Sequence, residues 1–312
     1  MSRDLVRRFV FENQGIRGQW VQIDAAWAAL RAHQTHAPPV RELLGQATCA
    51  ALLLASTLKF EGSLTFQLEG DGAVPLLVAQ CTHDFRVRAV ARAENVDPAA
   101  DFRALVGSGR VIVTVESEDR ATRYQGIVAL RGNTLARCLE SYFARSEQLP
   151  TAVQLAADAD RAGGLLLQRI AEDGGRAQGE VLTRAAGAGA EAAPESADGE
   201  RVWDGASAAV ANLDRDLLLR FAPEPLLRRS FPAYDLRLFA GAPVRFQCRC
   251  DEARVTNILR ALGASEVREV LAEQGAVTVT CEFCQRPYRF DAVDVERIFA
   301  QGIVARSPSS LN

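Results

Sequence analysis

A chain of 312 residues, 48% hydrophobic and 24% charged, has the composition of a globular protein and is long enough for two domains. The net charge is −3, and neither a basic tail nor an arginine stripe is present, which argues against nucleic acid as a partner. The longest apolar run, residues 49–55, is too short to cross a membrane, and the first residues form no apolar signal segment. We therefore expect a cytoplasmic protein with no membrane partner.

The first part of the chain, residues 1–170, combines strand-like and helical patterns. Strands are predicted at residues 5–11, 63–68, 85–90, 111–115 and 124–130. Helices are predicted at residues 39–58 and 134–147. Because the strands arrive in groups rather than in strict alternation with helices, we expect an α+β domain in which helices pack on antiparallel or mixed sheets.

Residues 171–235 form a predicted linker. Half of residues 171–200 are Ala or Gly, and such a stretch buries too little surface to offset its ordering entropy, so it is expected to be flexible. Five apolar residues then recur at helical spacing: Trp203, Ala206, Val210, Leu213 and Leu217. They indicate either an ordinary core-facing helix or an amphipathic segment that docks reversibly. Pro223, Pro225 and Pro232 are expected to break the chain before the next domain.

Four of the seven cysteines form two close pairs near the C-terminus. Cys248 and Cys250 make a Cys-x-Cys motif, and Cys281 and Cys284 make a Cys-x-x-Cys motif. Two such pairs are typical of a tetrahedral four-thiolate site, so we predict one Zn²⁺ per chain. In a compartment that keeps thiols reduced, clustered cysteines favour metal binding or redox sensing over a static disulfide framework.

The same cysteines also suit a redox switch. Two sulfurs on one tetrahedral Zn²⁺ lie about 3.8 Å apart, whereas a disulfide needs about 2.05 Å, so metal and disulfide exclude each other. A bridge across the Cys-x-Cys motif would need a strained backbone, and strained, accessible disulfides are the reversible kind. The alternative is a permanent structural zinc ribbon that never oxidises, and the spacing leaves both open.

Residues 236–302 are predicted to form a small domain around these cysteines. One helix follows Cys250 and ends at Gly263, with Val255, Ile258, Leu259 and Leu262 on its apolar face. A second helix is capped by Ser265, a two-stranded hairpin carries Cys281 and Cys284, and a last helix follows. A unit of about 60 residues is marginal alone, so bound zinc would dominate its stability.

The chain resembles the 33 kDa chaperonin (HslO) family of redox-regulated heat-shock chaperones. The resemblance rests on the two cysteine motifs and on stretches in the first half, which begin at Arg41 (RELLG), Thr57 (TLKFEGSLTFQ), Tyr124 (YQGIV) and Leu139 (LESYFARSEQLPT). It implies an ATP-independent holdase rather than an enzyme, a monomer that is inactive when reduced and zinc-bound. Oxidation would join Cys248 to Cys250 and Cys281 to Cys284, release zinc, unfold the domain and the linker, and produce a homodimer that captures unfolding client proteins.

Two rival functions can be weighed on the residues. A thiol-disulfide oxidoreductase would place its nucleophile at a helix N-terminus, but a strand is predicted before Cys281 and Pro287 follows the motif. A nucleic-acid-binding zinc ribbon would be basic, whereas residues 248–300 carry seven arginines and nine acids. The other cysteines, Cys49, Cys81 and Cys138, are expected to be buried core thiols.

Overall fold

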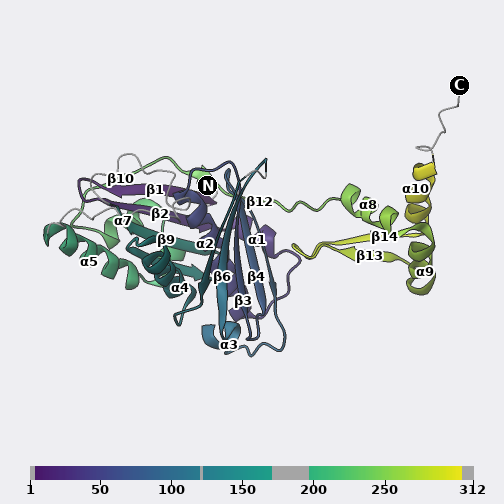
Figure 1. Ribbon diagram of the computed structural model, residues 1–312, viewed down its shortest axis with the longest axis horizontal. Coiled ribbons are helices and arrows are strands. Elements are labelled where there is room, and N and C mark those ends of the chain that lie inside the picture. Colours follow the sequence, from purple (N-terminus) through teal and green to yellow (C-terminus); the bar gives the residue numbers. More distant parts are fainter. Residues whose placement is uncertain (1–3, 120–121, 171–196, 304–312) are drawn as a thin grey trace, which may run out of the picture. The chain divides into compact units, whose positions relative to one another are not determined.

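The computed structural model describes residues 4–119, 122–170 and 197–303 (Figure 1). The chain divides into two compact units, residues 1–247 and 248–312. The first unit holds two six-stranded sheets with packed helices, and the second holds a two-stranded hairpin with helices. This is the α+β class expected from the sequence. Of the stretch expected to be flexible, residues 171–200, residues 171–196 lie outside the described residues.

The first sheet of the first unit has the strand order β10-β1-β2-β9-β8, and β11 also pairs with β1. Its strands are β1 (Leu5–Phe11), β2 (Ile16–Ile23), β8 (Thr151–Ala157), β9 (Ala162–Arg169), β10 (Leu236–Leu238) and β11 (Ala242–Pro243). All pairs are antiparallel. Gly18 lies opposite Phe9, and a Cβ there would come within 2.0 Å of the Phe9 ring. Only glycine lets this ring lie across the neighbouring strand.

The second sheet has the order β12-β5-β4-β3-β6-β7. Its strands are β3 (Gly62–Gly70), β4 (Leu76–Thr82), β5 (Arg86–Arg92), β6 (Gly109–Ser117), β7 (Arg123–Ala129) and β12 (Arg245–Phe246). The sheet is mixed, because β12 runs parallel to β5 while the other pairs are antiparallel. All five predicted strands are confirmed within a few residues, and the short helix α3 (Phe102–Val106) lies at one end of this sheet (Figure 1).

Helix α2 (Pro38–Thr57) joins the two sheets into one core. It contacts β2, β8 and β9 of the first sheet and β3, β4 and β5 of the second. The predicted helix 39–58 is confirmed, and residues on nearly all of its sides are buried, including Leu44, Cys49 and Leu52. A helix with a sheet on either side needs apolar or small residues nearly all round. The preceding helix α1 (Ala25–Arg31) adds Trp27 and Leu30 to the same core.

The second predicted helix is also present. It forms as α4 (Leu135–Tyr142), with Thr134 as N-cap, and continues into a π-helical turn, Phe143–Glu147. The Tyr142 hydroxyl donates to Glu147 Oε1 at 3.0 Å, and Tyr124 of β7 donates to the same oxygen at 3.4 Å. Two of the stretches that carry the family resemblance therefore meet at this carboxylate.

A second core lies on the other face of the first sheet. It is closed by α5 (Ala197–Ala211), α6 (Arg215–Arg220) and α7 (Pro223–Ser230), which pack against Phe9, Phe11, Trp20, Leu165 and Leu167. Ala206 and Val210 are fully buried, as the core-facing interpretation of the stripe requires.

Two expectations about this region are wrong. Residues 197–200 belong to α5 rather than to a flexible stretch. Pro223 and Pro225 begin α7 instead of breaking the chain, because a proline in the first turn gives up no helical hydrogen bond.

The second unit contains α8 (Glu252–Leu262), α9 (Ala264–Gln274), β13 (Val277–Thr280), β14 (Pro287–Phe290) and α10 (Ala292–Ile303). Val255, Leu259, Val267, Tyr288 and Val295 are among its buried residues. It begins at residue 248 rather than at 236, because β10, β11 and β12 pair with strands of the first unit.

The predicted details of this unit are partly wrong. Ile258 and Leu262 are 59% and 54% exposed, so only Val255 and Leu259 of the predicted face are buried. Helix α9 starts after Gly263, which places Ser265 inside its first turn rather than at the cap. The predicted end at Gly263 is confirmed, and α9 ends in the same way at Gly275; both glycines have a positive φ.

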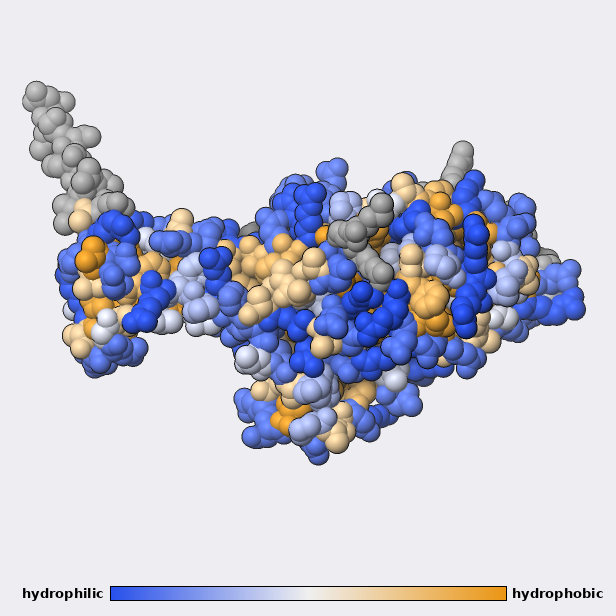
Figure 2. Space-filling view, turned by 180° about the vertical axis from the view of Figure 1, so that it is seen from behind, coloured by the Kyte–Doolittle hydropathy of each residue, from blue (hydrophilic) through white to orange (hydrophobic). Residues whose placement is uncertain are grey.

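None of the described helices is long and apolar enough to cross a membrane. On the face drawn in Figure 2, hydrophobic residues form separate patches between hydrophilic ones.

Candidate metal centre

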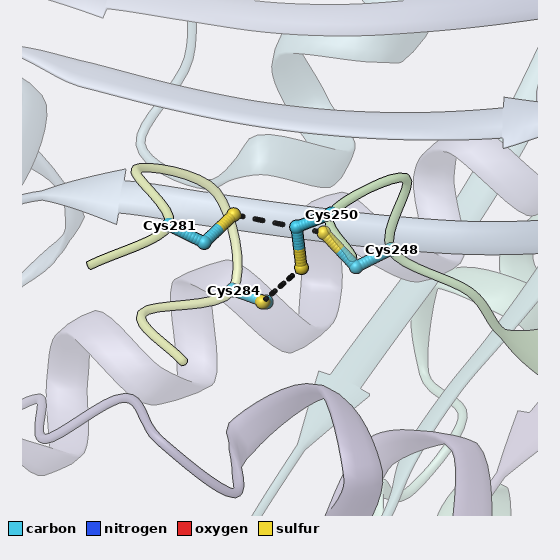
Figure 3. A group of neighbouring side chains, drawn as sticks. All are labelled: Cys248, Cys250, Cys281 and Cys284. Atoms are coloured by element: carbon cyan, nitrogen blue, oxygen red, sulfur yellow. Dashed lines mark hydrogen bonds between the residues drawn. The ribbon is translucent and has the colours of Figure 1, made fainter. Parts of the chain in front are cut away.

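Cys281 and Cys284 lie in the tight turn between β13 and β14 (Figure 3). The Cys281 N–H donates to the carbonyl of Arg286 at 3.0 Å, and the Gln285 N–H donates to the carbonyl of Cys281 at 2.9 Å. Gln285 takes a left-handed conformation, with φ of 58°. These backbone bonds close the turn and hold both sulfurs on the same side.

Cys248 and Cys250 lie directly ahead of α8 (Figure 3). Asp251 caps this helix, because its Oδ1 accepts from the N–H of Arg254 at 2.7 Å. The cap fixes where the helix starts, and so it also positions the Cys-x-Cys segment that precedes it.

The four sulfurs converge on one point. All lie within 4.8 Å of one another, with Cys248 and Cys281 Sγ 3.8 Å apart and Cys250 and Cys284 Sγ 3.4 Å apart. The longer of these distances equals the separation of about 3.8 Å expected on a tetrahedral Zn²⁺. Four thiols at this spacing fit a zinc-type metal ion, and the structure brings together all four cysteines singled out by the sequence.

The protonation of these thiols is uneven. Burial opposes ionisation of Cys248, but hydrogen bonds from the Cys250 backbone and the other thiols outweigh it and lower the pKa of Cys248 to about 7. Burial and the neighbouring Cys248 raise the pKa of both Cys250 and Cys284. A metal ion must therefore displace protons from the cluster, which makes binding pH-dependent.

Tyr288 is a neighbour of the centre that the sequence analysis did not single out. It is 8% exposed, and its buried hydroxyl has no hydrogen-bond partner among the described residues. Contact with Cys250 raises the pKa of this phenol, and Cys250 packs against the cluster that contains Tyr288. The hydroxyl therefore lies close enough to Cys250 for each group to influence the pKa of the other. The sequence signal was its position on β14, four residues after Cys284.

The turn is unlike the active site of a thiol-disulfide oxidoreductase. Cys281 follows β13 and Cys284 precedes β14, so neither lies at a helix N-terminus, which would lower a thiol pKa. The remaining cysteines, Cys49, Cys81 and Cys138, are buried in the first unit as expected. Burial raises their pKa values, which makes them poor nucleophiles.

In the first unit, polar contacts as well as the second core hold α5–α7 to the first sheet. The side chain of Gln22 is fully buried, and its Nε2 donates to the carbonyls of Leu218 at 3.2 Å and Leu219 at 2.6 Å. Gln22 thereby provides a hydrogen-bond donor for carbonyls at the C-terminal end of α6, which have no partner within the helix.

Ion pairs add to this attachment. They join Arg215 to Glu42 at 3.0 Å, Arg220 to Asp158 at 2.8 Å, and Glu224 to Arg7. All three pairs are partly exposed, so each contributes little alone.

A scan against family models matches the Hsp33 protein family over residues 4–291. The chain belongs to the Hsp33 family. The match includes all four cysteines of the centre and helices α5–α7, and membership assigns the chain to the Hsp33-type chaperones of the stress response.

Curated relatives agree with this assignment. A 33 kDa chaperonin of Azotobacter vinelandii is 39% identical over 302 residues, covering 96% of this chain and 95% of the relative. One of Nitrosococcus oceani is 37% identical over 304 residues, covering 97% of each. The fold matches the crystal structure of the Hsp33 homologue of Thermotoga maritima, with a TM-score of 0.73 at 21% identity, over 96% of this chain and 99% of that one.

Proposed function

We propose that this protein is a redox-regulated, ATP-independent holdase that binds unfolding client proteins under oxidative stress. In the reduced state one Zn²⁺ holds Cys248, Cys250, Cys281 and Cys284 together, and the protein is a monomer without holdase activity. Oxidation releases the metal and activates the protein as a homodimer. It works in the cytoplasm without nucleic-acid or membrane partners and is not an enzyme.

The observation that carries the proposal is the convergence of the four sulfurs within 4.8 Å. A metal ion would tie the segment before α8 to the turn between β13 and β14 and supply most of the stability of a unit this small. The same proximity gives every thiol a partner for oxidation. A single cluster can therefore both stabilise the reduced state and respond to an oxidant.

We propose hydrogen peroxide as a sufficient oxidant, acting on each pair in two steps. One thiolate attacks a peroxide oxygen, the O–O bond breaks, and a sulfenic acid and hydroxide form, the latter taking up a proton as water. The second thiolate attacks the sulfenic sulfur, the S–S bond forms, and a second water leaves after protonation. Two electrons pass from the pair to the peroxide. Loss of all four thiolates removes the ligands that held the metal.

The proposed pairs are Cys248 with Cys250 and Cys281 with Cys284, as the family resemblance implies. In the reduced cluster the sulfurs also approach one another between the motifs, Cys250 to Cys284 at 3.4 Å and Cys248 to Cys281 at 3.8 Å, and all four lie within 4.8 Å of one another. Proximity alone therefore favours no pairing. Peptide mapping of the oxidised protein by mass spectrometry decides between links within and between the motifs.

Activation is proposed to continue into the linker. Release of α5–α7 would uncover an apolar face formed by Phe9, Phe11, Trp20, Leu165 and Leu167. Such a face can bind unfolded chains, because contiguous exposed apolar surface is where proteins bind apolar partners. No nucleotide is needed, and the sequence has no phosphate-binding loop that ends in Lys-Ser or Lys-Thr.

The direct test measures aggregation of a thermally unfolding client in the absence of ATP. Oxidised, metal-free protein should suppress light scattering at an equimolar ratio, and reduced, zinc-loaded protein should not. Equal protection by both forms would remove the redox switch, and no protection by either would remove the holdase.

A further inference from the structure

The long sheets of the first unit end in four edges, and three of them are guarded. In the first sheet, β8 is covered by α4, α5 and α6, the Val153 N–H donates to Glu140 at 2.9 Å, and Arg215 binds the carbonyl of Ala157. The opposite edge consists of β10 and β11, which are three and two residues long. The β5 side of the second sheet is closed by the two-residue β12. Short strands, inserted charges and covering helices are how proteins block strand addition.

Strand β7 is the exception. It is seven residues long, and among the strands that the structure describes it pairs with β6 alone. Its alternate residues Arg123, Gln125, Ile127 and Ala129 direct their N–H and C=O groups away from β6, since the bonded pairs run through the residues between them. No hydrogen bond to these outward groups occurs in the described part of the chain. The strand contains no proline and no lysine.

The side chains along this edge suit an extended polypeptide. Ile127 is 58% exposed, the most exposed large hydrophobic side chain described in the first unit. Ile127 and Ala129 also line a shallow groove of about 480 Å³. Its other lining residues include Gly109 and Arg110 of β6 and Glu69 of β3. An added strand could pair with the outward groups and lay one side chain in this groove.

We propose that the open edge of β7 binds an extended segment of a client polypeptide as an added β-strand. This inference rests on the proposed holdase function and names a surface through which it acts. Pairing through the main chain needs no particular sequence, which suits clients that share only an unfolded backbone. A second copy fits less well, because two seven-residue strands with one exposed aliphatic side chain each fall far short of the ~800 Å² per partner of a stable dimer.

The edge is open in the reduced protein, so it cannot by itself be the switch. Strand pairing alone is weak in water. We therefore assign the edge the role of aligning a client segment, while retention depends on the apolar face beneath α5–α7 that oxidation is proposed to uncover. Edge contacts should thus form in both states and persist only in the oxidised one.

Amide hydrogen exchange tests the contact directly. The probe is reduced, carboxymethylated α-lactalbumin, which cannot refold, added to the oxidised full-length protein. Exchange at Gln125, Ile127 and Ala129 should slow by at least tenfold, whereas the amides already paired to β6 should change little. Unchanged exchange in a sample that co-elutes with the probe overturns the inference. Protection that rises with protein concentration without the probe assigns the edge to a second copy instead.

Substitution of one outward residue gives a second test. Ile127→Pro removes an outward N–H without touching the β6 ladder, and edge positions tolerate proline. Ile127→Thr is the matched control, since it keeps the N–H and the β-branch. The proline variant should bind the probe about tenfold more weakly, and the threonine variant within threefold of wild type. Should Ile127→Pro not fold, Ala129→Pro removes the next outward N–H.

The outcomes separate the two proposals. If oxidised wild-type protein fails to hold the probe, the holdase proposal and this inference both fall. If wild-type and proline variants hold it equally, only the edge inference falls.

Discussion

The side-chain amide of Gln22 donates to the main-chain oxygen of Leu219, 2.6 Å away, although the two residues are 197 positions apart. One partner belongs to β2 and the other to α6, so the bond ties a linker helix to the sheet it covers. Both groups are buried, and neither can find water while the helix is docked. Attachment of the linker thus depends on a specific polar contact as well as on apolar packing.

Gln22→Leu should weaken this attachment. The substitution removes the Gln22 donor from the Leu218 carbonyl and leaves the Leu219 carbonyl with the weaker bond from Arg161 at 3.3 Å. A buried carbonyl that loses its partner costs about 1–3 kcal/mol. We expect faster hydrogen exchange in α6 of the reduced protein and activation at a lower oxidant concentration. Gln67→Leu, at a half-buried glutamine that bonds Glu69 on the second sheet, is the control and should change neither. Identical exchange in both variants would show that Gln22 does not hold the linker.

Removal of two ligands should abolish metal binding. Cys281→Ser with Cys284→Ser deletes both thiols of the hairpin turn, so zinc affinity should fall by at least 100-fold and the second unit should lose its folded circular dichroism signal. Cys138→Ala, at a buried thiol of the first unit, should keep one zinc per chain. The zinc content of reduced samples is measured by metal analysis. One zinc per chain in the double variant would contradict the four-cysteine site.

Tyr288→Phe tests the buried phenol beside Cys250. Outer hydrogen bonds to metal ligands are worth about 10–100-fold in affinity, so competition with a chelator should show at least tenfold weaker zinc binding. Loss of a hydrogen bond to sulfur should also move the thiolate-to-metal charge-transfer band of the Co²⁺ form to longer wavelength. Tyr234→Phe in the first unit should leave both unchanged. An unshifted band would mean that the hydroxyl does not reach the ligand.

Glu147 makes stability depend on pH. Burial raises the pKa of Glu147, and the hydrogen bonds from Tyr142 and Tyr124 only partly oppose it. The folded-state pKa lies above the unfolded value of about 4.3, so the folded state binds this proton more tightly. The stabilisation that comes from the protonated Glu147 carboxyl is fully present below the unfolded-state pKa. It is lost as the pH rises through the folded-state pKa.

Wild-type stability should therefore fall relative to Glu147→Gln as pH rises from about 4. Urea unfolding of both proteins at several pH values, followed through the buried Trp20 and Trp27, measures the difference. If the difference in unfolding free energy between the two proteins stays constant over the pH range, Glu147 is not the group responsible for the pH dependence.

Release of the linker should be visible at Trp203. This side chain is partly buried against the second core, and subtracting the spectrum of Trp203→Phe isolates its emission without disturbing Trp20 or Trp27. Oxidation should shift the difference spectrum to the red and increase quenching by acrylamide, and reduction with zinc should reverse both. Constant emission after zinc has left would confine activation to the second unit.

The sequence predicted those features that depend on local pattern. The strand at Leu5–Phe11 and the four clustered cysteines follow from alternation and spacing. It did not predict that α2 lies between two sheets, because several residues buried outside its large apolar positions are small, such as Gly45, Ala50 and Ala55, and small residues also fit an exposed helix surface. Ile258 and Leu262 fit the helical period of Val255 and Leu259 but remain exposed, since a small unit has too few elements to cover a wide face.

Contacts between distant residues were also beyond the sequence. The hydrogen bond from Gln22 to α6 and the bond from the Val153 N–H of β8 to Glu140 depend on the topology. No local sequence pattern marks a glutamine or a glutamate as the partner of a remote backbone group. The open edge of β7 became apparent only once the strand order was known.

The two cores of the first unit divide its folding free energy into separable parts. The core around α2 contains no residue of 197–235, and every apolar contribution of α5–α7 goes to the other core. Undocking of these helices would therefore melt one cooperative block and leave the other intact. The proposed release of the linker would then give a half-melted state, and apolar substitutions in α5–α7 should tune how easily that state is reached with little change in the melting of the α2 core.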